Sequence, residues 1–124
     1  MTVIRSLIDD VFHELDARAV LIPHQGQVRD YLNKHPGIGD ILGPISTRAR
    51  QEFGDKTELA LEVYGDPEID DQYLTMYVRP QTYDRHIMKR IEGIRDQFRE
   101  FLAECSGWLL LTTDFLPPGY GNGV

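Results

Sequence analysis

The sequence has little cysteine and little serine, and it lacks the motifs of several common enzyme classes. Cys105 is the only cysteine among 124 residues, so an internal disulfide is excluded and a reducing compartment is favoured. Ser6, Ser46 and Ser106 are the only serines, and none lies in a G-x-S-x-G nucleophile motif. Neither G-x-G-x-x-G nor G-x-x-x-x-G-K-[ST] occurs. The sequence therefore contains no recognisable nucleophile or phosphate loop.

Long apolar runs and an excess of positive charge are also missing. No stretch approaches the roughly 20 apolar residues that span a bilayer, and no secretory signal pattern begins the chain. Lys and Arg number 13 against 20 Asp and Glu, which gives a net charge of −7. Nucleic acids and anionic membranes attract basic patches, so neither is an expected partner. We expect a cytoplasmic protein.

Residues 57–79 predict a β-hairpin. Two runs alternate apolar with polar side chains, and the eight residues between them, 65–72, are rich in the Gly, Pro and Asp of turns. Placing Tyr64 opposite Tyr73 puts the apolar residues of both runs on one face, and a slip of one residue would destroy this agreement. The other pairs expected in this register are Val63–Leu74, Leu61–Met76, Leu59–Val78 and Glu58–Arg79.

Helical periodicity appears in the segments 3–17, 24–34, 44–53 and 83–105. A short helical turn is expected at 39–42, before Pro44 at the first position of the third helix, where its missing N–H costs nothing. Residues 19–22 either continue the first helix or form a short buried connection. The last helix has the most regular apolar stripe, which consists of Ile87, Ile91, Ile94, Phe98, Phe101 and Cys105.

The expected fold is one α+β domain over residues 1–116 with the element order α-α-α-β-β-α-β. A small three-stranded sheet, made of the hairpin 57–79 and a strand 107–113 that is apolar on both faces, needs helices to cover it. The last strand pairs with either strand of the hairpin, and both orders remain open. Residues 117–124, rich in Pro and Gly, predict a flexible C-terminal tail or one laid over a neighbouring element.

The polar face of the hairpin is a candidate binding surface. Its neighbourhood is acidic, because the window 52–71 contains eight acids against Lys56 alone. A solvated sheet face is one interpretation, and a face for a basic protein partner is the other, since Tyr and Arg are favoured at interface hot spots. The candidate binding residues are Glu62, Tyr64, Asp70, Asp71, Tyr73, Tyr77 and Arg79.

The hairpin loop is also a weaker candidate for a divalent-cation site. Asp66, Glu68 and Asp70 are spaced two apart, as oxygen ligands of hard cations often are. The match to a helix–loop–helix calcium loop is poor, because Asp71 occupies the glycine position and Tyr77 the position of the bidentate acid. The alternative interpretation is an acidic loop that keeps the hairpin tip soluble.

The histidines and Cys105 carry no metal-binding pattern. The four histidines, at positions 13, 24, 35 and 86, have no ligand spacing to one another or to Cys105. Cys105 continues the apolar stripe of the last helix, so a small core residue is expected there.

The run Glu62–Leu74, which reads E-V-Y-G-D-P-E-I-D-D-Q-Y-L and is followed by Tyr77-Val78-Arg79, supports a resemblance. It is similar to an E-x-Y-x-D-P-E-I-x-D-x-Y-L run in a group of small bacterial proteins with no assigned activity. The likeness covers mainly the middle of the chain. It implies a bacterial protein and no catalytic residues.

These observations favour a small cytoplasmic binding protein over an enzyme. The expected role is a protein-binding or regulatory module, such as an accessory subunit, and a homodimer is compatible with it. The alternative is an enzyme or sensor that uses a divalent cation on the hairpin loop.

Overall fold

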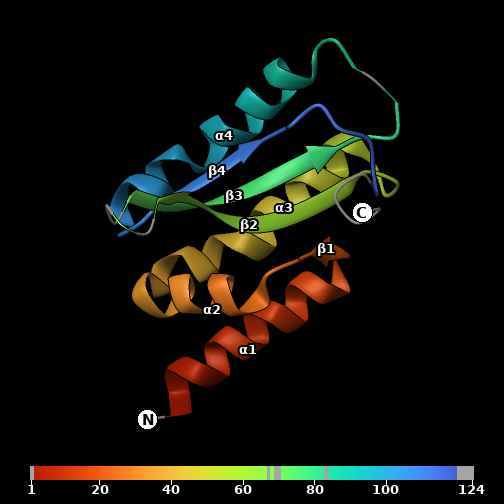
Figure 1. Cartoon of the computed structure of the whole chain (residues 1–124). Helices are drawn as coiled ribbons and strands as arrows, with labels where there is room; N and C mark the ends of the chain where they lie inside the picture. The colour runs from red at the N-terminus through yellow and green to blue at the C-terminus, as the bar shows by residue number, and fades with distance from the viewer. Residues whose placement is uncertain (1, 67, 69–70, 83, 120–124) are drawn as a thin grey trace.

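The chain forms an α+β domain in which helices pack against one sheet, as expected (Figure 1). A computed structural model describes residues 2–66, 68, 71–82 and 84–119, apart from the side chains of residues 2–7 and Asp66. The elements in chain order are α1 (Thr2–Ala17), β1 (Val20–Leu21), α2 (Gln25–Lys34), the 3-10 helix η1 (Pro36–Ile38), α3 (Gly39–Phe53), β2 (Glu58–Asp66), β3 (Asp71–Arg79), α4 (Ile87–Glu104) and β4 (Leu109–Thr112). Within the described chain, no helix is both long and apolar enough to cross a membrane.

The sheet has four strands in the order β1-β2-β3-β4, so the expected count of three was wrong. The additional strand, β1, pairs in parallel with β2 through Val20–Leu59 and Leu21–Ala60. A strand of two residues is too short to show an alternating pattern. The sequence therefore did not decide between the two structures considered for residues 19–22. β4 lies parallel to β3, which decides the strand order.

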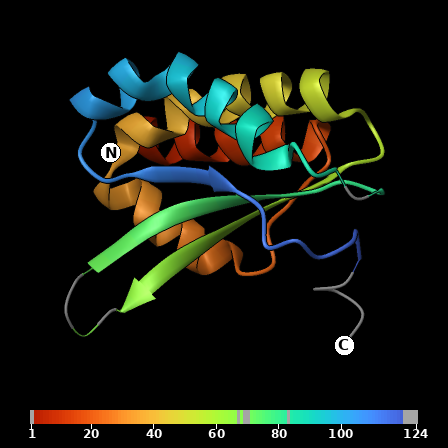
Figure 2. The ribbon, with the colours of Figure 1, turned by 90° about the horizontal axis from the view of Figure 1, so that it is seen from above.

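The helices leave one face of the sheet uncovered by any described helix. Figure 2 shows α1, α3 and α4 on one side of the strands, and α2 packs against β2 and β3. Strand residues alternate between the two faces, so every second residue points into the helical layer. The strand side chains buried on that side are Leu59, Leu61, Leu74, Met76, Val78, Leu109 and Leu111.

The hairpin has the predicted register, and it continues further toward the turn than expected. Tyr64 pairs with Tyr73, Leu61 with Met76 and Glu58 with Arg79, as the alternation required. Two more pairs, Gly65–Gln72 and Asp66–Asp71, shorten the connection to residues 67–70. The predicted eight-residue loop was therefore too long, because Gly65 and Gln72 belong to the strands despite their turn-like composition.

Pro44 lies inside α3 rather than at its start, so the predicted break between residues 42 and 44 was wrong. α3 runs without interruption from Gly39, which makes Pro44 its sixth residue. A proline at this position removes the N–H that would donate to the Asp40 carbonyl. Asp40 and Pro44 are both exposed, so water can solvate that carbonyl. Gly54 ends the helix with a φ of 95°.

Two apolar side chains near the C-terminus are more exposed than expected. Phe101 of the α4 stripe is 42% exposed, and Trp108, just before β4, is 44% exposed. β4 itself alternates, with Leu109 and Leu111 buried and Leu110 half-buried. The strand is therefore not buried on both faces, since no described helix covers its second side.

The segment after β4 lies over the end of β2, up to the last described residue. The Gly119 N–H donates a hydrogen bond of 2.8 Å to Glu58 Oε1, and the Leu116 N–H donates one of 3.2 Å to Asp114 Oδ1. Residues 120–124 of the predicted tail lie outside the described residues.

Gly65 should be intolerant of a side chain, whereas Gly93 should not be. At Gly65, φ is 125° and an added Cβ would lie 1.9 Å from the Asp71 carbonyl oxygen, while nothing lies within 4 Å of a Cβ at Gly93 in α4. We expect Gly65→Ala to lower the free energy of unfolding by about 1–3 kcal/mol. Gly93→Ala should raise it by about 1 kcal/mol. Urea denaturation measures both, and equal effects at the two positions would contradict the hairpin geometry.

Candidate binding face

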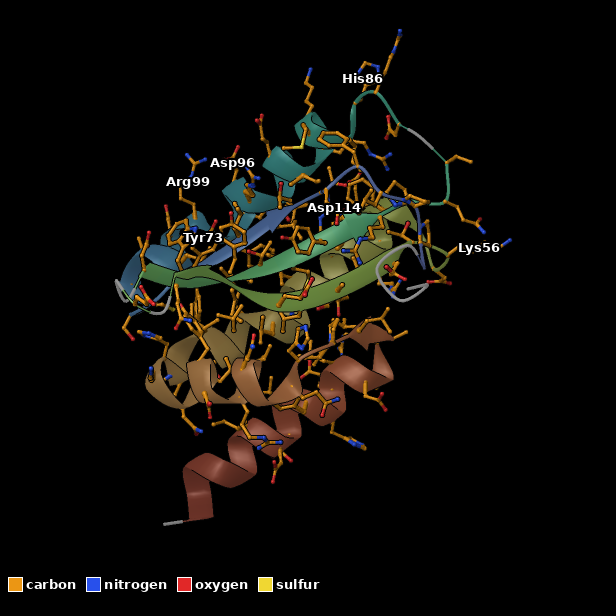
Figure 3. The ribbon with its side chains drawn as sticks, in the orientation of Figure 1. Lys56, Tyr73, His86, Asp96, Arg99 and Asp114 are labelled. Carbon is orange, nitrogen blue, oxygen red and sulfur yellow. The ribbon has the colours of Figure 1, made fainter. Side chains whose placement is uncertain are left out.

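The uncovered side of the sheet carries a cluster of aromatic and polar side chains that we call the tyrosine face. Its residues occupy the strand positions that alternate with the buried leucines of β2, β3 and β4. Figure 3 shows Tyr73 and Asp114 toward opposite ends of β3 and β4, so the face extends along the strands. The tyrosine face consists of Glu62, Tyr64, Tyr73, Thr75, Tyr77, Leu110 and Thr112.

The three tyrosines give this face an aromatic surface. The rings of Tyr64 and Tyr73 are 5.4 Å apart between centroids, at an angle of 43°. Tyr64 is 57% exposed, and Tyr73 and Tyr77 are half-buried. Burial raises the pKa of Tyr77, and the nearby Glu62 and Asp114 carboxylates raise it further. The Tyr77 phenol therefore stays neutral at ordinary pH. The three side chains present apolar rings with polar tips, which suits an interface.

Thr75 lies at the centre of the tyrosine face with an unsatisfied hydroxyl. It pairs with Glu62 on β2 and with Leu110 on β4, and only 2% of its surface is exposed. Its Oγ1 has no hydrogen-bond partner among the described residues. A buried hydroxyl left unpaired costs about 1–3 kcal/mol, so this side chain reduces the stability of the isolated domain.

Arg79 belongs to the predicted binding set, but intramolecular contacts occupy its guanidinium. The side chain is only 6% exposed, and it lies 2.8 Å from Glu58 Oε2 and 2.8 Å from Asp114 Oδ2. Its Cζ atom lies 5.2 Å from the centroid of the Tyr77 ring. The hydrogen bonds to Asp114 and Glu58 raise the pKa of Arg79 despite its burial. Arg79 therefore holds the end of the tyrosine face in place rather than offering a free charge.

Asp114 is the partner of Arg79 that sequence reasoning missed. It follows β4 and lies 35 positions from Arg79, so no local pattern connects the two residues. Burial alone would raise the pKa of Asp114, but hydrogen bonds from Arg79 and from the Leu116 N–H hold it below its usual range. The carboxylate therefore stays ionised and ties the C-terminal segment to β3.

The acidic hairpin tip is only partly described. Asp71 and Glu68 are exposed, whereas Asp70 and the side chain of Asp66 lie outside the described part of the chain. The described His, Cys, Asp and Glu side chains form no group of three that could hold a metal ion. Because Asp70 and the side chain of Asp66, two of the three candidate ligands, lie outside the described residues, the divalent-cation site stays a prediction.

His35 and Ser106 form a contact that the sequence did not reveal. His35 Nδ1 lies 3.0 Å from Ser106 Oγ, although the residues are 71 positions apart. A catalytic pair of this kind usually has a carboxylate that orients the histidine, and no described carboxylate bonds to His35. The neighbouring Cys105 is half-buried. Its burial raises the pKa of the thiol, and the negative charge of Asp40 raises it further. Neither Ser106 nor Cys105 therefore has the surroundings of an activated nucleophile.

Comparisons of the chain with models of protein families, with curated proteins and with solved structures found no match. The fold and the tyrosine face together define a small α+β domain with an aromatic sheet face that no described helix covers. The residues of that face are therefore the basis for a functional proposal.

Asp114→Asn should lower the free energy of unfolding by about 2 kcal/mol at neutral pH, because a hydrogen-bonded charge pair with Arg79 is lost. The pKa of Asp114 is lowered in the folded state, so its contribution is complete above the unfolded pKa of about 3.9 and disappears as pH falls through the folded value. The difference between wild type and variant should therefore shrink below about pH 4.

Urea denaturation at neutral and acidic pH measures this difference. Asp96→Asn is the matched control, because Asp96 pairs with Arg99 at an exposed site and should change stability by less than about 0.5 kcal/mol. A difference for Asp114→Asn that persists unchanged at low pH would contradict the ion pair.

Thr75→Val should increase stability by about 1 kcal/mol, because it removes a buried hydroxyl that has no partner. Thr112→Val on the same face is the control, since its half-buried side chain should change stability by less than about 0.5 kcal/mol. Thermal or urea denaturation compares the two variants. A loss of stability in Thr75→Val would show that the hydroxyl is already satisfied in the isolated protein.

Proposed function

We propose that this protein is a small binding module whose tyrosine face contacts a protein partner. The observation that carries the proposal is the set of three tyrosines on the side of the sheet that no described helix covers, among which Tyr64 is 57% exposed. Tyrosine is enriched among the residues that dominate binding energy in protein interfaces.

The shape of the tyrosine face suits a protein better than a small substrate. Tyr64, Thr75 and Leu110 come from three adjacent strands, so their side chains form a broad surface rather than an enclosed cleft. A hollow of about 500 Å³ at the hairpin end is lined by Val63, Tyr64, Gly65 and Asp71. It offers a place for one side chain of the partner, beside a carboxylate.

The charge of this region favours a basic partner. Glu62 is half-buried within the face and Asp71 is exposed beside Tyr64. Opposite charges on the two partners would speed association in a salt-dependent way. A homodimer through the same face would bring like charges together, so we favour a different, basic protein as the partner. In this proposal the protein acts as a regulatory or accessory module in the cytoplasm.

The first test is affinity capture of the tagged protein from its native host at low and high salt. We expect one stoichiometric partner at low salt, and we expect the double variant Tyr64→Ser/Tyr73→Ser to lose it. Phe101→Ser is the matched control, because it removes an aromatic side chain that is 42% exposed on α4, outside the tyrosine face. Circular dichroism confirms that each variant is folded.

Titration with the purified partner then measures affinity. The double variant should bind at least about tenfold more weakly, whereas Phe101→Ser should bind as wild type does. Equal affinity of the double variant and wild type, or the absence of a partner at both salt concentrations, would overturn the proposal.

A further inference from the structure

A hollow of about 560 Å³ lies between α1, η1 and α3, and we call it the α1–α3 groove. Its residues come from the helical elements, whereas the tyrosine face consists of strand residues that alternate with those buried under the helices. Sites for small organic ligands usually measure about 300–1,000 Å³, so the groove has the right size for one such molecule.

The floor of the groove is apolar. Leu32 is completely buried, Ile8 is nearly so, and Val11 is half-buried beside them. Gly39 also lines the groove, and an added Cβ there would lie 3.4 Å from Val11 Cγ2. The absence of a side chain at Gly39 therefore leaves space above the floor, which an apolar group of a ligand can occupy.

The rim of the groove carries negative charge. Asp10, Glu14 and Asp40 line it, and none of its lining residues is basic. Arg18 pairs with Glu14 at 3.2 Å, but no ion pair to a described side chain involves Asp10 or Asp40. Two exposed carboxylates therefore face an apolar floor from two different helices.

A hollow of similar volume, about 550 Å³, beside the start of α4 shows the contrast. It contains Arg90, whose charge is met by Glu52 at 2.8 Å and by Asp84. Arg85 also lines that hollow and has no ion pair among the described side chains, so the hollow does not favour a cation. The α1–α3 groove differs because every charged residue of its lining is acidic.

We propose that the α1–α3 groove binds a small organic cation with an apolar body, of the class of alkylammonium or arylalkylammonium ions. The apolar body would lie on Leu32, Ile8 and Val11, where burial away from water is favourable. The ammonium group would lie at the rim near Asp10 and Asp40. A bare metal ion would gain nothing from the apolar floor, and an anion would be repelled by the rim.

The test uses three probes of matched size, which are hexylammonium, 1-hexanol and hexanoate. Binding of each probe is measured through the changes it causes in the amide chemical shifts of the isotope-labelled protein. We expect saturable shifts around the groove with hexylammonium, binding of 1-hexanol several-fold weaker, and no binding of hexanoate. Asp10→Asn/Asp40→Asn should weaken hexylammonium binding by a factor of about 2 to 25, since each exposed charge contributes a factor of about 1.5 to 5.

Three further variants test separately whether binding depends on the rim carboxylates, on the space within the groove and on the tyrosine face. Asp30→Asn removes an exposed carboxylate on α2 outside the groove and should leave hexylammonium binding unchanged. Gly39→Leu should fill the space beside Val11 and weaken hexylammonium and 1-hexanol alike. Tyr64→Ser/Tyr73→Ser should have no effect on hexylammonium, so the tyrosine face and the groove are tested independently.

Three results would overturn the proposal. They are equal binding of the three probes, equal binding of hexylammonium to wild type and to Asp10→Asn/Asp40→Asn, and the absence of saturable shifts both with hexylammonium and with phenethylammonium, a fourth probe that represents the arylalkylammonium ions. A thermal melt of each variant shows that the comparison is made on folded protein.

Discussion

The register of the β2–β3 hairpin is the constraint on which the other features depend. Leu61 opposite Met76 gives the sheet an apolar side for the helices, and Tyr64 opposite Tyr73 places the aromatic rings on the other side. Side chains on a strand alternate with a period of two, so a shift of one residue would exchange the two sides. The hydrophobic core and the tyrosine face are therefore consequences of the same pairing.

The same register also places Arg79 beside Glu58, and this buried charge organises the end of the domain. A guanidinium taken out of water is costly unless carboxylates meet it. Glu58 supplies one contact from β2, and Asp114 supplies the second from the segment after β4. Glu58 Oε1 also accepts a hydrogen bond from the Gly119 N–H. Arg79 thereby links two strands and the C-terminal segment, and its position over the Tyr77 ring joins them to the tyrosine face.

The tyrosine face and the α1–α3 groove are negatively charged surfaces with different shapes. The tyrosine face is broad and aromatic, which suits a protein, whereas the groove is a hollow of ligand size with an apolar floor. Both proposals name a cationic partner, in keeping with the net charge of −7. Because one lies on strands and the other between helices, either can be altered by substitution without changing residues of the other.

The sequence by itself determined the class of fold, the hairpin register and the buried faces of α2 and α4 near Leu32 and Ile91, because these follow from local periodicity. Only the tertiary structure decided the rest. β1 has two residues and no period, and the continuation of α3 through Pro44 depends on solvent reaching the Asp40 carbonyl. The Arg79–Asp114 ion pair, the contact between His35 and Ser106, and the α1–α3 groove each bring together segments that lie far apart in the chain. No pattern within one segment encodes such contacts, since they arise only when the helices and the sheet pack together.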